Sequence, residues 1–132
     1  MKIVLDASAA IPAALGHEPG PAILELVDRA SLVVVPDIFV AEVTSGLWKY
    51  VNAGRFSIDH AIIRLRRTLD FVKRRELTED LAEEVLREAS ARRHAVYDMF
   101  YAVLARREGA VVVTLDKRLR KLVEEMGLPV QP

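Results

Sequence analysis

The stretch Lys2-Ile3-Val4-Leu5-Asp6-Ala7-Ser8 decides the fold. Its three consecutive apolar residues lack the polar alternation of a half-exposed strand, which indicates a strand covered on both faces, as in a parallel sheet. An acidic residue closes this strand, and the segment that continues to Leu15 is expected to be helical. A buried strand that leads directly into a helix is typical of an α/β fold.

Two more apolar strands repeat this pattern at Leu32–Val35 and Val111–Leu115, and short edge strands are expected at Arg75–Leu77 and Pro129–Val130. The intervening segments predict helices at Ala7–Leu15, Ala22–Ala30, Asp37–Asn52, Ile58–Arg74, Glu79–Arg93, Val96–Arg107 and Lys117–Met126, with Asp37, Ser57 and Thr78 as N-caps. Strands that alternate with helices predict a three-layer α/β sandwich with a central, mainly parallel sheet.

The length and composition predict one domain, residues 1–132, that forms its own core. The chain is 52% hydrophobic, which excludes disorder as its main state. No apolar run approaches the roughly 18 residues of a membrane span, so neither a signal peptide nor an anchor is expected, and we expect a cytoplasmic protein.

Almost all side chains that could ligate a metal in this chain are carboxylates. The chain has no cysteine, and its three histidines are scattered, so any metal must be held by oxygen. Nineteen basic residues balance nineteen acidic ones, but residues 55–75 carry seven basic against two acidic groups, and residues 76–91 carry six acidic against one basic group. We expect these two segments to be solvated helix faces that partly neutralise each other.

Four acidic residues stand out because their surroundings are apolar or small. Asp6 and Asp116 follow strands, so both are expected at the same edge of the sheet, although each could instead cap the next helix. Glu42 and Asp98 lie within predicted helices beside small residues, and each alone could be a solvated or paired acid.

If the four acids converge, their mutual repulsion requires an explanation. At about 5 Å and an effective dielectric constant of about 20, each pair of anions repels by roughly 3 kcal/mol. Six such pairs would exceed the roughly 5 to 15 kcal/mol by which a domain is stable. The acids must then share protons or bind cations, and Mg²⁺ or Mn²⁺ suits oxygen ligands.

Four segments in this order, Ile3–Ser8, Pro36–Glu42, Tyr97–Ala105 and Val113–Leu119, resemble the PIN-domain ribonucleases, and among them the VapC toxins of toxin–antitoxin pairs. The resemblance implies that Asp6, Glu42, Asp98 and Asp116 form an acidic quartet. Asp6, Asp98 and Asp116 would hold metal, and Glu42 would orient the attacking water or complete the coordination. Ser8 and Thr114 would support the carboxylates. Ser45 stands where the family often has Asn, three residues after the Glu.

The implied activity is a metal-dependent endoribonuclease that uses one or two Mg²⁺ or Mn²⁺ ions to hydrolyse RNA phosphodiester bonds, leaving 5′-phosphate and 3′-hydroxyl ends. The implied partners are a cognate antitoxin and a second copy of the chain in a homodimer. RNA-backbone contacts are expected from basic residues near the acids, namely Arg92, Arg93, Lys117, Arg118, Arg120 and Lys121.

The helix that begins after Asp37 carries more apolar residues than one narrow stripe requires, including Phe39, Trp48 and Tyr50. They belong either to the core or to a dimer or antitoxin interface. Two other functional classes remain: a non-catalytic interaction module of PIN-like fold, and a magnesium-dependent phosphotransfer domain. A phosphotransfer domain would need either a second acid two residues after Asp6 or an acid at the end of the strand Leu32–Val35. This chain has neither.

Overall fold

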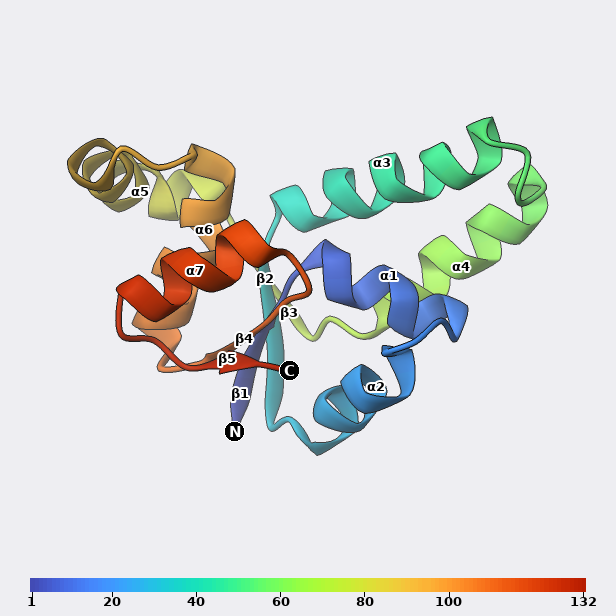
Figure 1. Ribbon diagram of the computed structural model, residues 1–132, viewed down its shortest axis with the longest axis horizontal. Helices are drawn as coiled ribbons and strands as arrows, with labels where there is room; N and C mark the ends of the chain where they lie inside the picture. The colour runs from blue at the N-terminus through green and yellow to red at the C-terminus, as the bar shows by residue number, and fades with distance from the viewer.

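The computed structural model describes residues 1–132 and places a five-stranded parallel sheet between two groups of helices (Figure 1). The three apolar strands β1 (Lys2–Leu5), β2 (Leu32–Pro36) and β4 (Val111–Val113) form its centre. The short strands β3 (Arg74–Glu76) and β5 (Val130–Gln131) form its edges. The order is β3-β2-β1-β4-β5, and all four pairings are parallel.

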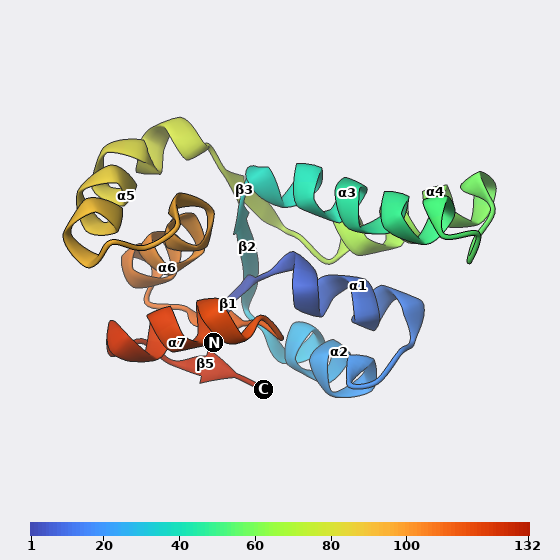
Figure 2. The same cartoon turned by 45° about the horizontal axis from the view of Figure 1, so that its top comes forward.

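Side chains that alternate along the strands pack against two helical layers. Ile3 and Leu5 belong to one apolar cluster, and Val4 belongs to the other. The first layer contains α1 (Ala7–Leu15), α2 (Gly20–Arg29), α3 (Ile38–Asn52) and α4 (Ile58–Asp70). The second contains α5 (Thr78–Arg92), α6 (Val96–Glu108) and α7 (Lys117–Glu125). Figures 1 and 2 show the layers on opposite sides of the sheet, which confirms the predicted three-layer architecture.

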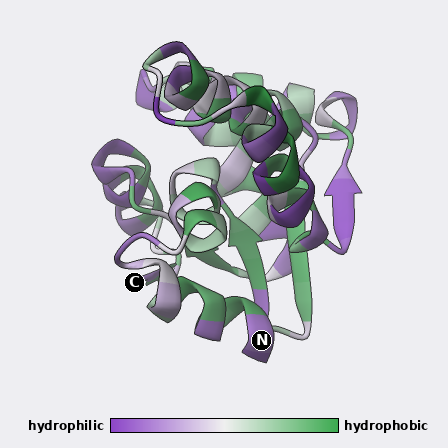
Figure 3. Ribbon diagram, turned by 90° about the vertical axis from the view of Figure 1, so that its right-hand side faces the viewer, coloured by the Kyte–Doolittle hydropathy of each residue, from purple (hydrophilic) through white to green (hydrophobic).

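The edge strand β3 differs in chemistry from the central strands. Its sequence is Arg-Arg-Glu, and Figure 3 shows it as a hydrophilic arrow apart from the hydrophobic strands beside it. Charged side chains on an edge strand discourage pairing with other chains. Because Arg74 pairs with Val34 of β2, the preceding helix ends at Asp70, and the prediction that it continues to Arg74 is wrong.

The structure corrects two predicted helix caps and confirms a third. The Asp37 carboxylate does not cap α3; its Oδ1 accepts a hydrogen bond from the backbone N–H of Thr78 at 3.2 Å, at the start of α5. Thr78 is therefore the first residue of α5, and its side chain does not cap the helix. Ser57 caps α4 as predicted, accepting from the N–H of His60.

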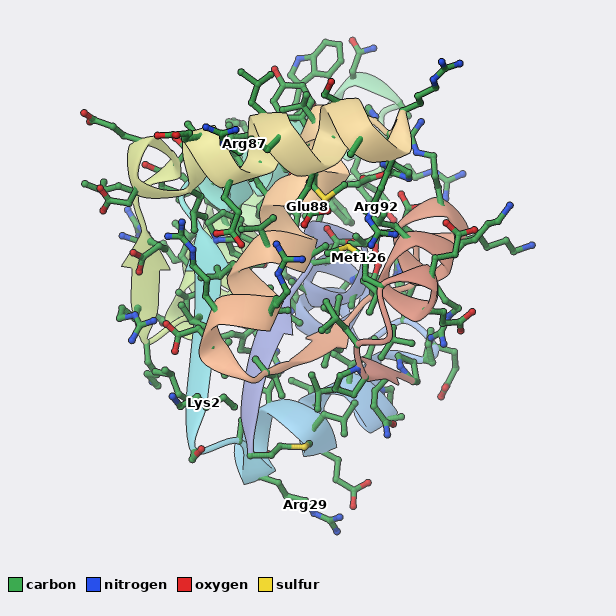
Figure 4. All side chains as sticks on the ribbon, turned by 90° about the vertical axis from the view of Figure 1, so that its left-hand side faces the viewer. Lys2, Arg29, Arg87, Glu88, Arg92 and Met126 are labelled. Atoms are coloured by element: carbon green, nitrogen blue, oxygen red, sulfur yellow. The ribbon has the colours of Figure 1, made fainter.

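The charged segments are paired mainly within one layer. Glu84 and Glu88 of α5 accept hydrogen bonds from Arg106 of α6 at 2.7 and 2.8 Å. Glu88 also pairs with Arg92, and the two lie together beneath α5 in Figure 4. The expectation that residues 55–75 and 76–91 neutralise each other holds for one ion pair, Arg74–Glu76, and is otherwise wrong. No helix has the length and apolar character that a bilayer crossing would need.

Candidate active site

The candidate site lies at the carboxyl ends of β1 and β4, where the strand order changes direction. The chain passes from β1 to β2 on one side, while β4 pairs with β1 on the other. Ligands of open parallel sheets bind at such a point. The backbone N–H of Asp6 donates to the carbonyl oxygen of Val113 at 3.0 Å, which joins the ends of the two strands.

Asp6 is a buried carboxylate held by two hydroxyl groups. Its Oδ2 accepts from Ser8 Oγ at 2.6 Å and from Thr114 Oγ1 at 2.8 Å, and it makes no side-chain capping bond to α1. Burial raises the pKa of Asp6, the two hydroxyl bonds oppose that shift, and the nearby Asp116 charge adds to it. Since Asp6 does not cap the helix, the capping alternative is wrong for this residue.

Ser8 and Thr114 also hold the loop after β4. Ser8 Oγ accepts the backbone N–H of Leu115, and Thr114 Oγ1 accepts that of Asp116, both at 3.0 Å. The two hydroxyls therefore fix the position of the Asp116 backbone relative to the Asp6 side chain.

Asp116 lies on the exposed side of the site and caps α7. Its Oδ1 accepts from the backbone N–H groups of Arg118 at 2.8 Å and Leu119 at 3.1 Å. The capping alternative is therefore confirmed for Asp116. Both bonds use Oδ1, so the cap leaves Oδ2 available for another ligand.

Glu42 projects from α3, and the Tyr101 hydroxyl of α6 donates to its Oε1 at 2.6 Å. Burial raises the pKa of Glu42, the Tyr101 bond opposes this, and the charges of Asp6, Asp98 and Asp116 raise it further. Burial, together with the surrounding carboxylates, also raises the pKa of Tyr101, so its hydroxyl stays protonated. The sequence analysis assigned no role to Tyr101; the available signal was its position one helical turn after Asp98.

Asp98, in the first turn of α6, is paired with a cation from α7. Arg118 Nε donates to Asp98 Oδ2 at 2.9 Å, and His94 Nε2 lies 4.0 Å from the same oxygen. The Asp98 side chain is 14% exposed, whereas that of Arg118 is 67% exposed. The sequence analysis assigned Arg118 to RNA binding and missed this ion pair.

The acidic quartet therefore gathers from four segments and from both helical layers. The charges of the other three members all raise the pKa of Glu42, so they lie within electrostatic range of it. No three Asp, Glu or His side chains are arranged so that they could hold a metal ion between them. The contacts described above engage one oxygen of each carboxylate, at Asp6 Oδ2, Glu42 Oε1, Asp98 Oδ2 and Asp116 Oδ1. The remaining oxygens are hard ligands of the chemical type that a divalent cation prefers, but they are not gathered around one point. Metal ligation by Asp6, Asp98 and Asp116 stays a prediction.

A hollow adjoins the quartet on the α3 side and has a volume of about 520 Å³. It is lined by Glu42 together with Ile38, Ala41, Ser45, Gly46, Lys49 and Tyr97, and we call it the α3–α6 hollow. Ser45 is exposed there, one turn along α3 from Glu42. Its predicted role in supporting the site is untested.

The basic residues predicted to bind RNA differ in whether they already form ion pairs within the protein. Arg92 pairs with Glu88, Arg120 with Glu124 and Lys121 with Glu125, each within its own helix, and Arg120 also donates to the carbonyl oxygen of Pro132. Exposed Lys117 and Arg93 form no ion pair. Arg93 ends α5 with a left-handed φ of 53°, an uncommon conformation for a residue with a side chain.

Comparisons with known proteins agree with this fold. A family model for the PIN domain matches residues 3–125, so the chain belongs to the PIN domain family. Within that family it is a homologue of ribonuclease VapC3 from Pyrobaculum aerophilum, with 32% identity over 133 residues that cover 98% of this chain and 100% of the relative.

Solved structures show the same fold. The crystal structure of PAE2754 from Pyrobaculum aerophilum superposes with a TM-score of 0.75 at 26% identity, covering 98% of this chain and 83% of that one. VapBC2 from Rickettsia felis, solved with a DNA fragment from the promoter, gives a TM-score of 0.68 at 18% identity, covering 99% and 98% of the two chains. FitAcB from Neisseria gonorrhoeae gives 0.57 at 19% identity, covering 98% and 96%.

Proposed function

We propose that the chain is a metal-dependent endoribonuclease of the VapC toxin type. The observation that carries the proposal is the acidic quartet at the switch point of a PIN-domain sheet, with charges that act on one another. Homology to a ribonuclease VapC over nearly the full length supports RNA as the substrate. Membership of the PIN domain family does not favour the phosphotransfer alternative.

In the proposed reaction each residue of the site has a distinct task. Asp6, Asp98 and Asp116 would hold one or two Mg²⁺ or Mn²⁺ ions through their free oxygens. Such an ion, when bound, lowers the pKa of water and stabilises charge on phosphoryl oxygens. Ser8 and Thr114 hold the Asp6 carboxylate in one orientation through their hydroxyl bonds.

Glu42 would position the water that attacks the RNA phosphorus. Its Oε1 is fixed by Tyr101, so its Oε2 is free to accept a hydrogen bond from that water. In-line attack by water would leave 5′-phosphate and 3′-hydroxyl ends.

The proposed partners are a cognate antitoxin, a second copy of the chain and the RNA substrate, with cytoplasm as the expected location. On α3 the residues Phe39, Val43 and Leu47 are buried in the core, so they are not part of an exposed interface. Trp48 is 59% exposed and lines an apolar hollow of about 180 Å³ between α3 and α4. Exposed tryptophan beside an apolar hollow is typical of an interface anchor. A VapBC complex among the structures of similar fold is consistent with such a partner.

The test is RNA cleavage by the purified chain. Cleavage in Mg²⁺ or Mn²⁺ that stops with EDTA, with 5′-phosphate ends found by end-mapping, supports the proposal. Equal rates with and without chelator would refute the metal mechanism. The absence of any cleavage in either metal would favour the non-catalytic interaction module.

A further inference from the structure

The α3–α6 hollow lies directly beside the acidic quartet. Its volume of about 520 Å³ lies within the roughly 300 to 1,000 Å³ of ligand pockets. Glu42 belongs both to the acidic quartet and to the wall of the hollow. An RNA strand whose phosphate reaches the quartet therefore brings a neighbouring nucleotide next to the hollow.

Tyr97 supplies an aromatic wall that the fold does not use. It is 67% exposed, belongs to neither apolar core cluster and stacks on no other ring. Tyr50, in contrast, stacks on Phe56 with ring centroids 4.9 Å apart. A lone exposed aromatic side chain is common on protein surfaces. Tyr97 differs because its ring borders a hollow and directly precedes Asp98 in the chain.

Lys49 supplies a positive charge at the other end of the hollow. It lies seven residues after Glu42, which places both side chains on one face of α3, about 10 Å apart along the helix axis. Lys49 is exposed and forms no ion pair. At that separation its ammonium group is suited to a phosphate next to the scissile one.

We propose that the α3–α6 hollow is a nucleotide subsite, in which an unpaired RNA base stacks on Tyr97 and the adjoining phosphate contacts Lys49. The proposal rests on the proposed ribonuclease function. The base must be unpaired and splayed out, since a base stacked within a duplex offers no free face to a side chain. The subsite therefore selects single-stranded segments and loops over continuous helices.

Binding is measured by fluorescence anisotropy of a short unstructured RNA with Ca²⁺ present, after gels show that the RNA stays intact. Tyr97→Ala is expected to weaken binding about tenfold, the loss of one stacked base, whereas Tyr97→Phe retains wild-type affinity. Lys49→Ala is expected to reduce the slope of log K against log salt by about 0.7. Lys73→Ala is the matched control, because Lys73 is exposed at the amino end of β3 whereas the quartet lies at the carboxyl ends of the strands, and its loss leaves affinity and slope unchanged.

A second readout assigns the contact to a base. A series of RNAs is prepared, each with one base removed at a different position. The wild type is expected to bind one RNA of the series more weakly than the intact RNA. Tyr97→Ala is expected to bind that RNA and the intact RNA equally. In Mg²⁺ the same variant is expected to raise KM about tenfold with little change in kcat.

The outcomes separate the subsite from the ribonuclease function. A wild-type protein that cleaves RNA while Tyr97→Ala keeps its KM and abasic profile overturns the subsite alone. A wild-type protein that cleaves no RNA overturns the function on which the subsite rests. Unchanged RNA affinity in Tyr97→Ala, combined with lost binding of a protein partner, would assign the hollow to that partner and overturn the subsite.

Discussion

Asp98 is the quartet member whose charge is balanced by a side chain of the protein itself, Arg118. Asp98→Asn keeps the shape of the side chain but removes the charge that the proposed metal site requires. We expect cleavage to fall by about a hundredfold or more while the circular dichroism spectrum stays unchanged. Cleavage at the wild-type rate would remove Asp98 from the site.

The charge of Asp6, in contrast, is not balanced by a basic side chain, and its carboxylate is buried next to other acids. A raised pKa means that the folded state binds the proton more tightly than the unfolded state. The stabilising contribution of this group is therefore fully present below the unfolded pKa and is lost as pH rises through the folded pKa. At pH 7, without divalent metal, Asp6→Asn is expected to raise the melting temperature by a few degrees.

This result depends on the amide oxygen of Asn accepting the bonds from Ser8 and Thr114. Thermal unfolding in EDTA measures it, and adding Mn²⁺ should stabilise the wild type more than the variant. A large drop in melting temperature would show that the charge of Asp6 is needed for folding. Ser8→Ala, which removes one hydroxyl and keeps the charge, separates the two contributions.

At the scale of elements, α5 and α6 are joined by an ion-pair network. Hydrogen bonds from Arg106 are the main reason that the pKa values of Glu84 and Glu88 are lowered. A lowered carboxyl pKa adds stability above the unfolded pKa and loses it as pH falls through the folded pKa. Arg106→Ala is therefore expected to cost about 1 kcal/mol near pH 7, a small value because the groups are partly exposed.

The pH dependence identifies the network. The difference in unfolding free energy between wild type and Arg106→Ala should shrink as pH falls below about 4.5, where the glutamates become protonated. Urea titrations at pH 7 and pH 3.5 measure it. A difference that does not change with pH would assign the effect to lost packing of the arginine stem. Arg87→Ala is the control, since Arg87 pairs only with highly exposed Glu83 in its own helix.

Helices, strands and caps were predicted correctly where the local residue pattern alone determines the structure. The continuous apolar runs of β1, β2 and β4 predicted buried strands, and Ser57 was predicted to cap the helix that follows it; the structure has both. The prediction that Asp37 caps α3 was wrong because a carboxylate can accept from a helix far away in the sequence, here α5 at Thr78. The end of α4 was wrong for a similar reason, since pairing with β2 overrides the helical preference of Arg74.

The same limit applies to the site. The positions of the four acids were predictable from strand ends and from the PIN-domain resemblance. Their partners were not, because Tyr101 and Arg118 reach them across tertiary contacts. The sequence also does not show that only one oxygen of each carboxylate is hydrogen-bonded, because this depends on how the side chains lie in three dimensions.

For the whole molecule, α3 and α4 run side by side and project from the sheet (Figures 1 and 2). Trp48→Ala is expected to weaken homodimer or antitoxin binding by about 2 kcal/mol or more, because tryptophan anchors dominate interfaces. Light scattering and titration with the antitoxin measure the two separately. Ile63→Ala is the control, being 63% exposed on α4 and outside the apolar hollow. Unchanged assembly in both assays would leave Trp48 without a partner.

The quartet takes Asp6 and Glu42 from the layer of α1 and α3, and Asp98 and Asp116 from the layer of α6 and α7. A small slide of one layer over the other would thus alter the spacing of the oxygens without changing any residue that touches them. The chain has no cysteine, so a single one can be placed on each layer and labelled with a nitroxide. The distance between the two spin labels would then report whether the halves of the molecule draw together when manganese, RNA or a protein partner arrives.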